Sequence, residues 1–245
     1  MNISIIIPAY NEENKISADI LAAYNFISDN NYVGEIIVVD DGSSDETSSI
    51  ASSYKEKVKS NLTVLKLSEN SGKGRAVSEG IKISSGEIVM YADAGLTVPF
   101  ENALIGIELI NSKKCDIANG SRKMESATIV KQQDLDRRVI SKVFGFLFKT
   151  VLKIPKEMTD TQCGFKVYNG KIARELFPKL STTGFLFEVE FILLAIKEGY
   201  KIKEFPVTWK CDRDSRLSVS GSSMNIISEF ISLKRSTDLP TKRTG

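Results

Sequence analysis

Short apolar runs alternate with longer amphipathic segments through the first hundred residues. The runs have the length and β-branched character of buried strands. The predicted strands are 3–7, 35–40, 62–67 and 87–92. Between them, the segments 13–30, 45–58 and 74–83 read as helices; in 13–30 the apolar residues recur at helical spacing. Strands that alternate with helices predict right-handed βαβ units and a mostly parallel sheet flanked by helices.

The second half of the chain has a looser rhythm. Its predicted helices are 100–112, 134–154 and 186–198, and its predicted strands are 116–121 and 202–209. No internal repeat and no low-complexity linker interrupts the chain. We therefore expect one α/β domain over residues 1–245, in which the last residues, 236–245, form a polar tail.

Composition excludes several classes of protein. The 245 residues carry 33 Lys and Arg against 31 Asp and Glu, a net charge of +2, which argues against a nucleic-acid binder. Histidine is absent, so Ser-His-Asp catalysis and histidine metal ligands are excluded. The three cysteines are far apart, which disfavours a zinc site and fits a reducing compartment. With no apolar stretch of about 20 residues and a strand-like start, we expect a cytoplasmic protein without a signal peptide.

Three polar clusters follow predicted strands, at 8–13, 40–45 and 93–97. Each alone fits a turn or a helix cap. In an open parallel sheet, however, ligands bind at the carboxyl ends of the strands, and three such clusters favour a binding site. The dinucleotide and P-loop glycine signatures are missing. The Gly- and Lys-rich segment 70–75 offers backbone N–H groups and Lys73 to part of an anionic ligand.

These motifs together resemble the family-2 glycosyltransferases, which have the GT-A fold. The first half carries PAYNEE, VVDDGSSDET and NSGKGRAVSEGI. The second half carries GSR at 120–122, TDTQCGFKVYNG at 159–170, FEVEFILLA at 187–195, FPVTW at 205–209 and SRL at 215–217. These resemble the polyprenyl-phosphate sugar synthases, and the dolichyl-phosphate glucosyltransferase branch fits best. The resemblance implies a nucleotide-sugar-binding half over 1–119 and an acceptor-binding half over 120–235.

The resemblance also assigns a nucleotide pocket. Asp40 and Asp41 match the positions that contact the base and ribose. Other positions assigned to nucleotide binding are Pro8, Ala9, Tyr10, Glu12, Gly72, Lys73, Ala92 and Asp93. The implied donor is a UDP-sugar.

A divalent cation is implied at Asp93, which matches the first acid of the family's D-x-D motif. Mg²⁺ or Mn²⁺ there would stabilise the negative charge on the departing nucleoside diphosphate. The second acid is replaced by Gly95, which has no side-chain ligand. Asp93 alone suffices if phosphate oxygens and water complete the coordination. The alternative is a metal-independent or non-catalytic protein that binds nucleotide sugars.

An acceptor phosphate that is already ionised needs orientation and neutralisation, not a general base. Arg122, Arg213 and Arg216 match family positions near the reacting phosphates, and arginine offers bidentate contacts. Solvated surface charge is the plain alternative. Gln162 lies in the most specific motif and is expected at the active site. Glu188 and Glu190 are two apart on a predicted helix and do not share a face, and we expect Glu190 to be the one that orients the sugar.

Residues 139–154 combine large apolar side chains with Lys142, Lys149 and Lys153 on one helical face. Such a helix is typical either of a core helix with one wet face or of a helix lying in a bilayer interface. Because the implied acceptor is lipid-linked, we expect a peripheral contact with the cytoplasmic face of a membrane. A membrane partner or a homo-oligomer would be compatible with that placement.

The predicted enzyme is therefore an inverting hexosyltransferase. Its expected reaction moves glucose from UDP-glucose onto a dolichyl-type polyprenyl phosphate. GDP-mannose or another UDP-sugar as donor, and a soluble glycan as acceptor, are the alternatives within the same class.

Overall fold

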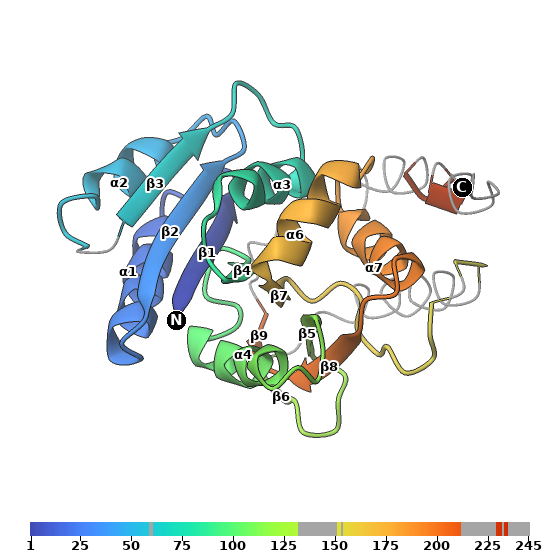
Figure 1. Cartoon of the computed structure of the whole chain (residues 1–245). Helices are drawn as coiled ribbons and strands as arrows, with labels where there is room; N and C mark the ends of the chain where they lie inside the picture. The colour runs from blue at the N-terminus through green and yellow to red at the C-terminus, as the bar shows by residue number, and fades with distance from the viewer. Residues whose placement is uncertain (59–60, 132–150, 153, 212–228, 232, 235–245) are drawn as a thin grey trace.

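The structure is a computed structural model that describes residues 1–58, 61–131, 151–152, 154–211, 229–231 and 233–234 (Figure 1). Its main sheet has seven strands in the order β3-β2-β1-β4-β7-β5-β8. These strands are β1 (Asn2–Ala9), β2 (Val33–Asp40), β3 (Asn61–Lys66), β4 (Ile88–Ala92), β5 (Ile117–Ser121), β7 (Phe165–Asn169) and β8 (Ile202–Pro206). β6 (Thr128–Lys131) and β9 (Thr208–Lys210) pair separately as two parallel strands. The predicted α/β fold with a mostly parallel sheet is confirmed, and the main sheet takes strands from both predicted halves.

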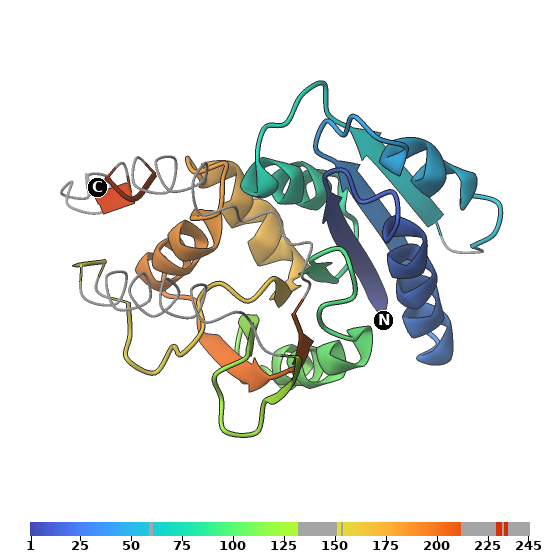
Figure 2. The same ribbon diagram turned by 180° about the vertical axis from the view of Figure 1, so that it is seen from behind.

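Helices cover both faces of the sheet (Figures 1 and 2). On one face lie α1 (Ile16–Asp29), α2 (Thr47–Ser53) and α4 (Ala103–Asn111), the last preceded by the short 3₁₀ helix η1 (Phe100–Asn102). On the other lie α3 (Lys73–Ile83), α6 (Gly170–Leu176), the 3₁₀ turn η2 (Phe177–Lys179) and α7 (Phe187–Lys197). Alternate strand residues feed two separate cores: Ile5 and Met90 pack toward α1, and Ile6 and Tyr91 pack toward α3 and α7.

The two halves of the chain differ in how well their pattern predicts the elements. All four strands predicted before residue 100 are present, with ends shifted by at most two residues. The predicted strand 202–209 is instead two strands, because Val207 separates β8 from β9. The predicted helix 134–154 lies mostly outside the described residues. The sequence analysis missed β6, α6 and β7.

The missed strand β7 has an unusual position in the sheet. It lies between β4 and β5 and runs antiparallel to both. Lys166 occupies its second position and is 1% exposed. A charged residue inside a five-residue strand breaks the apolar run by which strands are predicted, so the pattern Phe-Lys-Val-Tyr-Asn gives a weak signal. β7 brings the TDTQCGFKVYNG motif to the end of β4.

Candidate active site

The first two polar clusters meet at the carboxyl ends of β1 and β2. Ala9 pairs with Asp40 in register, and the Asp41 N–H donates to the Ala9 carbonyl at 2.8 Å. Side chains of the second cluster, and of Thr47 just after it, then accept hydrogen bonds from the backbone of the first. These bonds join Asn11 N to Ser43 Oγ, Glu12 N to Thr47 Oγ1 and Glu13 N to Asp45 Oδ2. The structure thus brings together the predicted pocket residues Pro8, Ala9, Tyr10 and Glu12 with Asp40 and Asp41.

Asp40 and Asp41 both hold backbone in place. Asp40 is fully buried; its Oδ1 accepts from Ser43 N, and its Oδ2 has no hydrogen-bond partner among the described residues, with Lys66 Nζ 3.9 Å away. Asp41 accepts hydrogen bonds from Ser71 N at 2.8 Å and Gly72 N at 2.9 Å. Burial raises the pKa of Asp41, although these two hydrogen bonds act against it. Contact of either carboxylate with a base or ribose stays a prediction.

In the Gly- and Lys-rich segment, which is predicted to hold part of an anionic ligand, two of the backbone amides have partners within the protein. The amides of Ser71 and Gly72 are already bonded to Asp41. Gly72 has φ +98°, and a Cβ there would lie 2.6 Å from the Thr183 carbonyl oxygen, so glycine permits a close approach of backbones. The part of this segment that reaches the third cluster is the side chain of Lys73, the first residue of α3.

Asp93 follows β4 and lies against the TDTQCGF motif. Its N–H donates to the Gly164 carbonyl at 2.9 Å. A Cβ at position 164 would lie 1.9 Å from Asp93 Oδ2, so only glycine leaves room for this carboxylate. The Asp93 side chain keeps 36% of its surface exposed and forms an ion pair with Lys73 Nζ at 2.7 Å. Gly164 of this motif therefore determines where the side chain of Asp93, the predicted metal ligand, can lie.

Behind Asp93 lies a buried group of charged and phenolic side chains. Glu188 on α7 accepts a short hydrogen bond from the Tyr91 hydroxyl, and its carboxylate lies 3.9 Å from Lys73 Nζ and 3.8 Å from Lys166 Nζ. Burial alone would lower the pKa of Lys73, but the charges of Asp93 and Glu188 raise it overall. Burial and then the Glu188 charge raise the pKa of Tyr91 well above its usual value. The ammonium of Lys73 thus stays charged beside Asp93.

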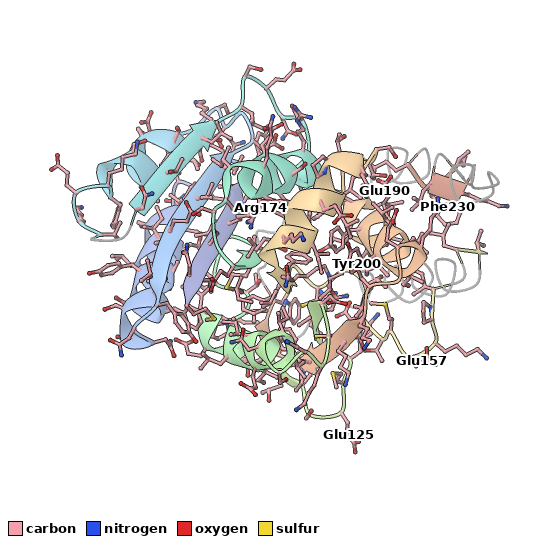
Figure 3. The ribbon with its side chains drawn as sticks, viewed as in Figure 1. Glu125, Glu157, Arg174, Glu190, Tyr200 and Phe230 are labelled. Atoms are coloured by element: carbon pink, nitrogen blue, oxygen red, sulfur yellow. The ribbon has the colours of Figure 1, made fainter. Side chains whose placement is uncertain are left out.

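Glu190 has a different environment from Glu188. It accepts hydrogen bonds from Ser181 N, Ser181 Oγ and Thr182 N, which fastens the turn before α7. Figure 3 marks Glu190 among the side chains around this helix. These contacts do not support the expectation that Glu190 orients the sugar. They favour Glu188, which is joined to Asp93 through Lys73.

Arg122 follows β5 and clamps the start of the specific motif. Its Nε and one Nη donate to the two oxygens of Asp160 at 2.7 and 2.9 Å, and the Nη also donates to the Gln162 carbonyl at 3.0 Å. The ring of Trp209 lies against the guanidinium, and its centroid is 5.4 Å from Arg122 Cζ. Burial would raise the pKa of Asp160, but the Arg122 charge and hydrogen bonds lower it to about 2. Arg122 and the Gln162 backbone therefore lie together, and the structure shows Arg122 as an anchor for this loop.

The thiol of Cys163, which lies in the same motif, is not reactive. It is 1% exposed, and burial raises its pKa to about 12. A thiol with that pKa stays protonated near neutral pH.

Asp19 is a site residue that sequence analysis missed. It lies on α1, is 1% exposed, and accepts hydrogen bonds from the amides of Gly95 and Leu96 at 2.9–3.0 Å. Burial raises its pKa to about 6, although the two amides act against it. The available signal was an aspartate at a buried position of an amphipathic helix, but its partners are backbone groups 76 and 77 residues away.

Some predicted features fall outside the described residues or have no counterpart within them. Arg213, Arg216 and residues 139–150 lie outside the described ranges. Within those ranges, no three acidic or cysteine side chains cluster as a ready-made metal site. No helix in the described part of the chain is long and apolar enough to cross a membrane.

The arrangement of strands, the charged site and the motifs can be set beside known proteins. The model of glycosyl transferase family 2 matches residues 4–177. Dolichyl-phosphate beta-glucosyltransferase of Dictyostelium discoideum is 32% identical over 95% of this chain and 73% of its own length. The human protein of the same name is 32% identical over 88% of this chain and 69% of its own length.

Solved structures support the fold at lower identity. Glucosyl-3-phosphoglycerate synthase of Mycobacterium tuberculosis, in complex with Mn²⁺, UDP and phosphoglyceric acid, has a TM-score of 0.69 at 19% identity, covering 98% of this chain and 80% of its own. S. aureus TarS 1–349 with UDP-GlcNAc has a TM-score of 0.64 at 18% identity, covering 98% and 68%.

The fold is therefore that of the GT-A glycosyltransferases, as predicted. This chain belongs to glycosyl transferase family 2. The predicted class of enzyme, a hexosyltransferase, is confirmed by the family match and the curated relatives.

Proposed function

We propose that this chain transfers glucose from UDP-glucose to a dolichyl-type polyprenyl phosphate, with inversion at the anomeric carbon. The observation that carries the proposal is the likeness to dolichyl-phosphate beta-glucosyltransferases, at 32% identity across 95% of the chain. It extends over both the sheet edge with Asp93 and the motif around Gly164. The donor binds at the carboxyl ends of β1, β2 and β4, as ligands do in open parallel sheets.

Mg²⁺ or Mn²⁺ is the proposed cofactor, and the residues present fit it. Asp93 offers hard carboxylate oxygens on a partly exposed side chain, in a space that a Cβ at position 164 would fill. A cation of this kind is held by one or two carboxylates together with substrate phosphates. When bound, it would neutralise charge on the departing diphosphate. A structural neighbour of the same fold contains Mn²⁺ with UDP-glucose.

The proposed step is a single displacement. An oxygen of the acceptor phosphate attacks the anomeric carbon as the bond from that carbon to the UDP oxygen breaks, and the bonding electron pair leaves with UDP. The attacking phosphate is already ionised, so no general base is required. Lys73, held beside Asp93 and Glu188, supplies positive charge where negative charge develops. Glu188 is the better-supported carboxylate for keeping that ammonium in position.

The acceptor side rests on Arg122, Gln162, Arg213 and Arg216. Arg122 keeps part of its fork for a phosphate while it binds Asp160, because a guanidinium has five N–H donors. We propose that residues 139–154 meet the cytoplasmic face of the membrane that holds the acceptor's lipid chain. A membrane partner or a second copy of the chain would be compatible with this placement.

The experiment is a lipid-extraction assay. Purified protein is incubated with radiolabelled UDP-glucose, a short polyprenyl phosphate and Mg²⁺ or Mn²⁺, and label is counted in the lipid phase. The expected result is labelled lipid that disappears with EDTA and falls at least about 100-fold in Asp93→Asn. Labelled lipid from GDP-mannose but not from UDP-glucose would replace the donor. Full activity of Asp93→Asn would remove Asp93 from the cation site.

Gly95 favours one second candidate, a protein that binds nucleotide sugars without turning them over. Position 95 supplies no carboxylate, so the cation would be held more weakly than by a complete D-x-D pair. UDP binding by calorimetry, without transfer of either sugar to lipid or to soluble glycans, would favour this candidate.

A further inference from the structure

The loop that carries Asp93 is fastened from beneath by a carboxylate of α1. Asp19 Oδ1 accepts from Gly95 N at 3.0 Å and from Leu96 N at 2.9 Å, and its Oδ2 lies 2.9 Å from Gly95 N. Asp19 is 76 residues distant from Gly95 in sequence and is 1% exposed. Two successive amides that point at one anion form a backbone nest, and here the anion is a side chain of the protein itself.

The backbone of this nest is strained. Gly95 has φ +89° and Leu96 has φ +47°. Leu96 is a non-glycine residue with a left-handed backbone, a conformation that costs energy and persists only where its surroundings enforce it. Both amides point at Asp19 only because the two residues adopt these angles. The carboxylate therefore holds the segment that begins two residues earlier with Asp93.

Burial destabilises the ionised carboxylate of Asp19. Its raised pKa shows that the ionised form is disfavoured by burial despite the two amide donors. An asparagine would fit the same space without a buried charge. A costly charge at a strained loop next to a functional residue points to a role in the site rather than in stability.

We infer that Asp19 is the positioning residue for Asp93. Asp19 supports the cation site indirectly, by fixing the backbone of the loop, whereas a second acid at position 95 would bind the cation directly. Gly95 is then a requirement of this arrangement, because its amide and its positive φ are both used. The inference rests on the proposed cation site at Asp93. It corrects the simpler interpretation of Gly95 as only a lost ligand, and it implies that Gly95→Asp would disturb the nest.

The test measures Mn²⁺ binding rather than turnover. Free Mn²⁺ is titrated by electron paramagnetic resonance in the presence of saturating UDP, for wild type, Asp19→Ala, Asp19→Asn and Asp93→Asn. Asp29→Asn, exposed at the end of the same helix, is the matched control. UDP affinity without metal and hydrogen exchange at the Gly95 and Leu96 amides are measured on the same proteins.

We expect Asp19→Ala to weaken Mn²⁺ binding about 10-fold or more, as loss of groups that orient metal ligands does. Asp19→Asn should lose less, because one amide oxygen can accept both N–H groups. UDP affinity without metal should change less than about 2-fold, while the two amides exchange faster in Asp19→Ala. Adding Leu96→Gly to Asp19→Ala should not restore Mn²⁺ binding, because relieving strain frees the loop further.

Two outcomes would overturn the inference in different ways. If Asp93→Asn loses Mn²⁺ but Asp19→Ala and Asp19→Asn bind it like Asp29→Asn, Asp19 does not position Asp93 and the proposed cation site still stands. If Asp93→Asn also binds Mn²⁺ normally, the proposed site fails and the inference fails with it. Should Asp19→Ala not fold, Asp19→Leu, which fills the buried space but accepts no hydrogen bond, decides between these results.

Discussion

Two loops converge on Asp93, and each is held through a buried aspartate with a different kind of partner. The loop 93–97 is held by Asp19, whose hydrogen bonds come from neutral backbone amides. The loop 159–164 is held by Arg122, which forms a bidentate ion pair with Asp160. Both carboxylates are 1% exposed, yet the pKa of Asp19 rises to about 6 and that of Asp160 falls to about 2.

The contrast shows that a buried carboxylate is stabilised by the formal charge of its partner more than by the number of its hydrogen bonds. Around Asp19, the nearby charges of Glu12 and Lys15 act in opposite directions. Around Asp160, desolvation is the largest single contribution, but the charge and hydrogen bonds of Arg122, with the charge of Lys123, together outweigh it. The buried charge of Asp19 at the loop 93–97 therefore costs stability, whereas the ion pair of Arg122 with Asp160 in the loop 159–164 contributes to stability.

The change with the largest expected effect removes the guanidinium of Arg122, which holds the second loop. Arg122→Gln should lower the free energy of unfolding by about 3–5 kcal/mol, because Asp160 would be left as an uncompensated buried charge. Urea unfolding measures this. Arg75→Gln removes an exposed arginine from its pair with the partly buried Glu79 and should cost less than about 1 kcal/mol. Equal losses in the two variants would contradict the burial argument.

The pH dependence sharpens the comparison next. Because the folded pKa of Asp19 is above its unfolded value of 3.8, its contribution to stability is present below pH 3.8 and is lost as pH rises through 6. Relative to Asp19→Asn, wild type should lose about 2 kcal/mol of unfolding free energy between pH 4 and pH 7. Asp160 is present in both proteins, so its own titration cancels in this difference. A constant difference between wild type and Asp19→Asn across the window would rule out the raised pKa.

A third case tests carboxylates that share one helix. Glu188→Gln should cost about 2 kcal/mol, because it removes the counter-charge of the buried Lys166 ammonium and leaves Lys73 with Asp93 alone, and it should also slow transfer. Glu190→Gln, at the exposed Ser181 turn, should cost less than about 1 kcal/mol and leave transfer nearly unchanged. Unfolding curves and the lipid assay on the same pair give both values. A larger loss of transfer in Glu190→Gln would reverse the assignment.

The smallest expected effect lies where the two loops touch. Gly164→Ala would force Asp93 aside, because the added Cβ meets its carboxylate, and transfer should fall about 10-fold. Gly199→Ala is the control for a glycine substitution; position 199 has positive φ, unlike position 164, but no neighbour lies within 4 Å of the added Cβ. Transfer rates of the two variants, compared at equal folded fraction, make the measurement. Equal rates would mean that the position of Asp93 is not critical.

Sequence patterns predict the regular part of this molecule well and its long-range polar contacts poorly. The four strands before residue 100 are apolar runs that report their own burial. No local sequence pattern indicates the role of Asp19, since that role depends on amides that come near it only in the folded chain. Asp93 and Arg122 could be predicted from motifs, but the pairing of Arg122 with Asp160 could not. Two residues 38 apart in sequence carry no local sign that they meet.

Glu188 and Glu190 show the same limit on a smaller scale. Helical spacing separates their faces but does not say which face looks toward the sheet. Tyr91 and Lys166, which decide the matter, belong to β4 and to the missed strand β7. An error in one strand therefore becomes an error in the site.

The position of β7 also bears on the order in which the chain acquires its structure. β4 has all five of its residues buried, and one of its edges pairs with a strand that begins 73 residues after β4 ends. During synthesis the first four strands can pair with one another before β7 exists, which leaves an apolar strand edge open. Until residue 169 has emerged, β5 also lacks β7, the strand that joins it to the rest of the sheet. Nascent chains that stop between β5 and β7 should therefore be the species most prone to aggregate, so the strand that completes the site also closes the sheet.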